Sequence, residues 1–192
     1  MPDYAFRSRP TEFRAEAPAD GQPIILDGYF VVFDQPYYID DYCEEVIDRH
    51  ALDHADMSDV RALIDHDSRL CLARRNENVR TLDFSIDETG LFGRIQINPA
   101  DSDAMSLRAR VQRRDVDQAS FGFEERVVEY SDLPGGRVRR TVKEISKLWE
   151  ISVCTFPAYE QTTVSARSRN GDALRKELLE HRKSNLRRKL KK

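Results

Sequence analysis

The sequence lacks the features of a membrane or exported protein. Its 192 residues contain no apolar run of roughly 18 residues, so we expect no membrane-spanning helix. The N-terminal stretch MPDYAFRSRPTEFRAEAP has no apolar centre of the kind that a secretory signal requires. These absences predict a cytosolic protein that does not associate with membranes.

Cysteine is scarce and its pattern excludes several kinds of site. The three cysteines, Cys43, Cys71 and Cys154, are odd in number, far apart and without a C-x-x-C spacing. A disulfide framework, a structural zinc site or a dithiol redox site would need a different arrangement. We therefore expect reduced, buried thiols.

Histidine is also rare, with four in the chain. His50 and His54 are four residues apart on a helix predicted near 49–58 and could share a metal. No third ligand is evident, so we interpret both as surface side chains. His181 lies in a charged segment and is interpreted as a solvated side chain. His66 differs, because VRALIDHDSRL places it directly after an apolar, strand-like run, where site residues often lie.

Charge is distributed unevenly along the chain. From residue 167 to 192 there are 11 Lys and Arg against 3 Asp and Glu, a net charge of +8. The whole chain has a net charge of −3, so residues 1–166 carry −11. Leucines recur at helical spacing within this basic segment. We predict one domain over 1–166 and a basic, amphipathic helical tail over 167–192, with a linker at 167–171.

Short β-like stretches between turn residues dominate the first 164 residues, so we expect a mainly β, α+β fold. GYFVVF (28–33) reads as a buried strand, and residues 82–86 and 91–97 flank the turn DETG as a hairpin. A second hairpin is predicted around SDLPGG. A second helix is predicted from Asp101 or Ser102, with Ala104, Leu107 and Val111 on one face.

The stretch DQASFGF supplies a candidate nucleophile. On a strand, Phe121 and Phe123 point to one face, while Ser120 and Gly122 point to the other. The phenylalanines can anchor the strand in a core, leaving a hydroxyl beside a position without a side chain. The alternative is a tight packing spot between strands. A serine hydroxyl also needs a base to accept its proton, and His66 is the best-placed histidine.

A serine–histidine pair further needs a carboxylate that orients the imidazole. KLWEISVCTF offers Glu150 inside an apolar run, where a carboxylate needs a polar partner or contact with water. A salt bridge to an arginine is the alternative role, and Asp65 and Asp67 compete for the contact with the histidine. The G-x-S-x-G frame of the α/β-hydrolases is absent, because position 118 is Gln118.

These pieces occur in an order that resembles a known family. The stretches are GYFVVFD, EEVIDRHALDHA, LIDHD, GLFGRIQI, QASFGFE and LWEISVCTFPAY. From about Gly28 to Val164 the chain resembles the HK97-type prohead proteases of tailed bacteriophages. His66 matches the family's histidine, Ser120 its nucleophile and Glu150 its recurrent acidic position. Asp65 departs from the usual N-H-D pattern.

The resemblance implies a serine endopeptidase without a cofactor and with the fold of the herpesvirus assembly proteases, a β-barrel decorated with helices. It implies residence in the host bacterial cytoplasm, within the assembling prohead, and cleavage of the phage scaffold, the major capsid protein or the enzyme itself. A homo-oligomer is compatible with it. The alternatives are a catalytically silent assembly protein and a non-peptide hydrolase. The tail's leucines favour a protein partner over nucleic acid.

Overall fold

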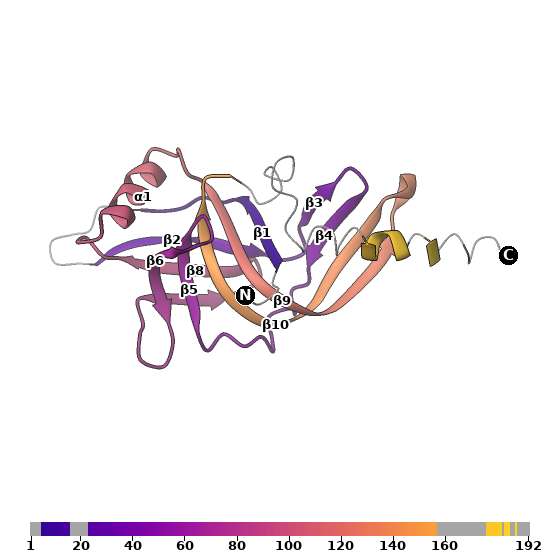
Figure 1. The fold of residues 1–192 in the computed structure, drawn as a ribbon, viewed down its shortest axis with the longest axis horizontal. Helices are drawn as coiled ribbons and strands as arrows, with labels where there is room; N and C mark the ends of the chain where they lie inside the picture. Colours follow the sequence, from indigo (N-terminus) through magenta and orange to yellow (C-terminus); the bar gives the residue numbers. More distant parts are fainter. Residues whose placement is uncertain (1–4, 16–22, 157–175, 182, 185–186, 188–192) are drawn as a thin grey trace.

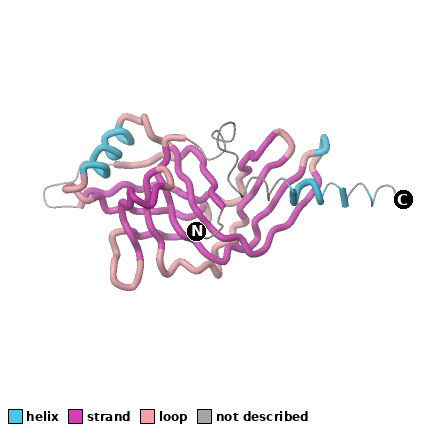
Figure 2. Tube along the Cα trace, in the orientation of Figure 1, coloured by secondary structure: helices cyan, strands magenta, loops and turns pink. Residues whose placement is uncertain are grey.

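The structure is a computed structural model that describes residues 5–15, 23–156, 176–181, 183–184 and 187. Strands dominate it, as the sequence predicts (Figure 2). In chain order they are β1 (Ala5–Pro10), β2 (Ile24–Val32), β3 (Pro36–Asp40), β4 (Cys43–Ile47), β5 (Val60–Ile64), β6 (Asp67–Arg75), β7 (Leu82–Ile86), β8 (Gly90–Ile97), β9 (Gln118–Asp132) and β10 (Val138–Cys154). The helix α1 (Ser102–Gln112) precedes β9, and a 3₁₀ turn, η1 (Pro134–Gly136), joins β9 to β10.

Two sheets make up the fold. The larger has seven strands in the order β1-β9-β10-β4-β3, with β5 added beside β10 and β6 beside β5. The smaller has three, in the order β2-β8-β7. The expected barrel is wrong, because the described strands form no closed ring. A barrel closes only when its first and last strands pair, and here β1 and β3 end the larger sheet with one described partner each.

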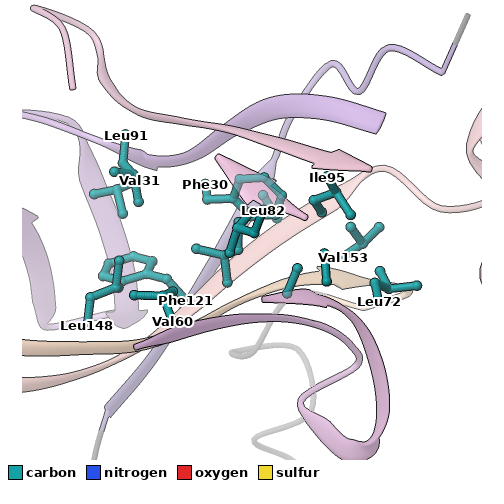
Figure 3. Close-up of a cluster of buried hydrophobic side chains, with 14 of the residues drawn as sticks. Phe30, Val31, Val60, Leu72, Leu82, Leu91, Ile95, Phe121, Leu148 and Val153 are labelled. Carbon is teal, nitrogen blue, oxygen red and sulfur yellow. The ribbon is translucent and has the colours of Figure 1, made fainter. Parts of the chain in front are cut away.

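The core lies between these sheets. Phe30 of β2, Leu82 of β7 and Ile95 of β8 meet Phe121 of β9 and Val153 of β10 in one cluster (Figure 3). Phe121 and Phe123 are both 0% exposed and their rings stack, with centroids 4.8 Å apart. The predicted anchoring role of the two phenylalanines is therefore confirmed. Ser120 points to the face of β9 opposite to that of the two phenylalanines.

Both predicted hairpins form. The first is β7–β8, and the second is the long β9–β10 pair, whose turn uses Gly135 and Gly136, each with a φ of 76°. Figure 1 shows this long hairpin running from the body of the molecule into an arm that also contains β3 and β4. Along its second edge β10 pairs in parallel first with β4 and then with β5. The strand β10 thus connects the arm to the body.

Of the two helices predicted within residues 1–166, one forms. α1 is capped by the Asp101 carboxylate, which accepts from the backbone N–H groups of Asp103 and Ala104, and it buries Ala104, Leu107 and Val111 as expected. The helix predicted near 49–58 is wrong, because this segment is a series of turns. Its backbone hydrogen-bonds to β10 instead, from Ile145 N–H to the Ala51 carbonyl and from Asp56 N–H to the Ser146 carbonyl. A regular helix would satisfy these groups internally.

The described part of the basic tail packs against the arm. Residues 176–181, 183–184 and 187 are helical, and Leu178 is buried against Cys43 and Val138. The His181 ring stacks on Tyr130 with centroids 5.1 Å apart, so its interpretation as a solvated side chain is wrong. Burial and a 2.7 Å hydrogen bond to Glu177 raise the pKa of Tyr130 to about 12. The predicted linker at 167–171 and Leu174, Leu186 and Leu190 lie outside the described residues.

Candidate active site

The site lies where β9, β10 and β5 run side by side. Ser120 on β9 is directly opposite Ser152 on β10, and Gly122 is opposite Glu150. Directly opposed residues of an antiparallel pair share a face of the sheet. Ser120, Ser152 and Glu150 therefore share the face opposite to the one on which Ile151 and Val153 enter the core. The bare position at Gly122 faces the long carboxylate side chain.

His66 reaches this face from a tight turn between β5 and β6. Ile64, the last residue of β5, pairs with Val153 of β10. The next two residues, Asp65 and His66, have positive φ angles of 48° and 60°, which bulky residues rarely adopt. This sharp reversal returns the imidazole over β10. The predicted position of His66, just after a strand and in a turn, is confirmed.

Two residues far apart in sequence meet at this point. His66 Nδ1 lies 2.7 Å from Glu150 Oε1, a hydrogen bond that spans 84 positions of the chain. Glu150 is 3% exposed, and the His66 side chain is 21% exposed. A carboxylate on Nδ1 favours the tautomer with the proton on that nitrogen, so that Nε2 is unprotonated and can act as a base. The partners of Glu150 that the described contacts place are His66 and Ser152, and none is an arginine.

The two competing aspartates have other partners. The Asp65 carboxylate accepts from the Thr155 backbone N–H at 2.8 Å and faces its hydroxyl at 3.2 Å. Asp67 pairs with Arg69 at 2.6 Å, and this guanidinium lowers the pKa of Asp67 to about 2. The contact with the imidazole therefore belongs to Glu150.

The Ser120 hydroxyl is fully buried and, within the part of the chain that the structure describes, Oγ has no hydrogen-bond partner. Buried hydroxyls are normally paired, so an orphan hydroxyl at a site requires an explanation. His66 Nε2 lies 3.8 Å from Cys154 Sγ. Catalytic hydrogen bonds are often long or poorly aligned in a substrate-free enzyme and shorten when substrate binds.

Sequence reasoning missed two contributors to the site. Ser152 bridges Glu150 and the His66 backbone, and Cys154 lies beside the imidazole. Both follow Glu150 at intervals of two residues on one strand, so strand periodicity alone places them on the same face. Burial, with nearby Asp65 and Glu150, raises the pKa of the Cys154 thiol, which therefore stays neutral at physiological pH.

Among the described residues, neither a metal-binding group nor the pocket includes His66, Ser120 or Glu150. Among the described residues, no group of three or more His, Cys, Asp and Glu side chains is placed to hold a metal ion. His50 contacts Asp53, with 3.0 Å between Nδ1 and Oδ2. A pocket of about 450 Å³ is lined by residues 10–14, Val111, Arg114, Val116 and Asp117, and it contains no histidine.

No helix among the described residues is long and apolar enough to cross a membrane.

The comparisons with known proteins agree with these features. The profile of the caudovirus prohead serine protease family matches residues 10–177, which is most of the chain. The chain therefore belongs to this family, and the resemblance noted in the sequence is confirmed.

A curated relative is the prohead protease of Enterobacteria phage HK97, which is 44% identical over 80 residues. The match covers 42% of this chain and 34% of the relative, so the chain aligns with about a third of that protein's length. No solved structure matches the chain. The expected likeness to the herpesvirus assembly proteases therefore stays a prediction.

Proposed function

We propose that the chain is a serine endopeptidase that processes the phage scaffold, the major capsid protein or both inside the prohead, and that it also cuts itself. Membership of the prohead serine protease family supports the class of reaction. The observation that carries the proposal is the 2.7 Å contact between His66 and Glu150 beside the strand that bears Ser120. A buried carboxylate is costly unless it is hydrogen-bonded, and the His66 imidazole supplies one of the partners of Glu150.

Each residue has a distinct role in the proposed reaction. Ser120 Oγ attacks the peptide carbonyl carbon while His66 Nε2 accepts its proton. Collapse of the tetrahedral intermediate breaks the C–N bond, and His66 returns the proton to the leaving amine. Water then hydrolyses the acyl-enzyme by the same route. Glu150 holds the imidazole and stabilises the imidazolium in both halves of the reaction.

A second candidate function has its own support. The Ser120 hydroxyl is fully buried, so a substrate peptide reaches it only after the site opens. An assembly protein that keeps the fold without catalysis would also show a closed serine. A buried serine would also suit a protease that acts inside the closed prohead, because low activity in dilute solution protects its partners before assembly.

The deciding experiment measures intact mass against time for the purified chain and for Ser120→Ala, alone and with phage scaffold and capsid protein. We expect discrete fragments from the parent and none from the variant. The positions of the cuts then define the sequence preference. An intact parent in every mixture and at every concentration would favour the silent assembly protein.

A further inference from the structure

Ser152 occupies a central place among the site residues. Its hydroxyl donates to Glu150 Oε2 at 2.5 Å and accepts from the His66 backbone N–H at 3.3 Å. The residue is 0% exposed. A serine hydroxyl has one donor and two acceptor positions, so these two bonds use its donor and one acceptor. One hydroxyl thus joins the carboxylate to the backbone of the histidine.

The first of these bonds fixes the carboxylate. Glu150 Oε1 faces His66 Nδ1 and Oε2 accepts from Ser152, so each carboxylate oxygen has a partner. A glutamate side chain has three rotatable bonds and loses considerable freedom when held in one conformation. Two contacts restrain it better than one, so the hydroxyl keeps Oε1 directed at the imidazole.

The second bond restrains the histidine. The turn at Asp65 and His66 uses two consecutive left-handed residues, neither of them glycine. Such conformations persist where surrounding contacts determine them. Ser152 supplies one contact through the His66 N–H, and Thr155 supplies another through Asp65. Ser152 lies on β10, and Thr155 is the residue that follows this strand. The same strand carries Glu150.

We propose that Ser152 is a positioning residue for the reaction proposed above, acting through Glu150 and His66 and not on the substrate. It holds the imidazole in the tautomer and orientation that the attack by Ser120 requires. This inference rests on the proposed function. A role for Ser152 as the nucleophile does not fit its contacts, because its proton goes to the carboxylate and its contact with His66 is to the backbone N–H.

The test compares Ser152→Ala with Ser146→Ala. Ser146 lies on the same strand and donates to the Glu124 carbonyl at 3.2 Å, so its replacement removes a similar bond from another place. We expect Ser152→Ala to lower kcat by about 10- to 100-fold with little change in KM, since small errors in position cost rates of this order. Ser146→Ala should cleave at the parental rate.

A second readout does not depend on activity. In full-length protein carrying Ser120→Ala, the ¹⁵N imidazole signals of His66 report which ring nitrogen holds the proton. We expect one tautomer with the proton on Nδ1 in the Ser120→Ala protein and in its Ser146→Ala derivative. Adding Ser152→Ala should give a mixture of tautomers or a broadened signal. Ser152→Cys, whose thiol fills the space but is a weak donor, should have the same effect without leaving a cavity.

The outcomes separate this inference from the proposed function. A parental kcat together with an unchanged imidazole spectrum in Ser152→Ala and Ser152→Cys would overturn the positioning role. Continued cleavage by Ser120→Ala would overturn the proposed nucleophile while the spectrum still tests the Ser152 contacts. Loss of activity in Ser152→Ala with an unchanged spectrum would also reject positioning.

Discussion

Ser120 and Ser152 are directly opposed on β9 and β10, and yet their hydroxyls have different surroundings. Ser152 Oγ is bonded to Glu150 and to the His66 backbone, whereas Ser120 Oγ has no partner within the described residues. A nucleophile needs a hydroxyl that can turn toward a substrate carbonyl, and a positioning residue needs one that is held. The strand pairing places two chemically identical side chains opposite each other, and their different contacts are the reason why we propose different roles for them.

The identity of the carboxylate gives the first prediction. Glu150→Gln should lower kcat by about 10⁴-fold with KM nearly unchanged, because an amide favours the wrong imidazole tautomer. Asp67→Asn is the matched control and should retain parental activity, since Asp67 pairs with exposed Arg69. Steady-state cleavage of a scaffold-derived peptide measures both. Equal losses in the two variants would contradict the assignment of Glu150.

Replacement of Cys154 tests whether the nucleophile is the Ser120 oxygen or the Cys154 sulfur. Its thiol lies 3.8 Å from His66 Nε2, but burial raises its pKa and keeps it protonated. Cys154→Ala should therefore keep kcat within about threefold of the parent, as expected when a nearby group takes no part in bond making. Ser120→Ala should show no cleavage above background. A Cys154→Ala variant that is inactive but has the parental unfolding transition would contradict this prediction and indicate that the Cys154 thiol is the nucleophile.

The buried ion pairs of Glu45 predict sensitivity to acid. Glu45 is 0% exposed and pairs with Arg7 and Arg140. Burial alone would raise the pKa of Glu45, but these two guanidinium groups lower it below its ordinary value of 4.5. The folded pKa lies below the unfolded one, so the stabilisation is complete above pH 4.5 and falls as pH drops further.

Glu45→Gln measures this contribution. It should lower the free energy of unfolding by about 3–5 kcal/mol at pH 7, because two buried arginines lose their shared partner. The difference from the parent should shrink as pH falls toward 3. Urea denaturation at several pH values gives both quantities, and Glu77→Gln on the exposed surface is the control. A difference independent of pH would show that Glu45 does not titrate with unfolding in this way.

The contact between tail and arm gives the last prediction. Leu178 is 8% exposed and packs on Cys43, whereas the adjacent Leu179 is 51% exposed. Leu178→Asp should release the helix and speed alkylation of Cys43 by about 10-fold or more, since local opening controls access to a buried thiol. Leu179→Asp should leave the rate unchanged.

Mass mapping of the alkylated sites in a Ser120→Ala background measures this without self-cleavage. Cys71 is exposed, so the expectation of buried thiols is wrong for this residue, and it serves as the internal reference for reagent activity. Identical Cys43 rates in the two leucine variants would show that Leu178 does not cover the thiol in solution.

Much of the fold follows from local patterns in the sequence. Alternation placed Phe121 and Phe123 in the core and Ser120 on the other face, and turn residues marked the β7–β8 and β9–β10 hairpins. The cap at Asp101 and the spacing of three apolar residues located α1. These signals are short in range, because strand faces, turns and caps depend on residues within a few positions of one another.

Other features depend on contacts between distant segments. Only the pairing of β5 with β10 decides that Glu150, and not the neighbouring Asp65 or Asp67, meets His66. Backbone groups of residues 51–56 hydrogen-bond to β10, and these bonds take the place of those within the helix that was predicted near 49–58. The open sheets were likewise not predicted from the sequence. The sequence by itself determined which candidate residues share a strand face, and tertiary structure decided which of them meet, because strand register is set by packing across the whole sheet.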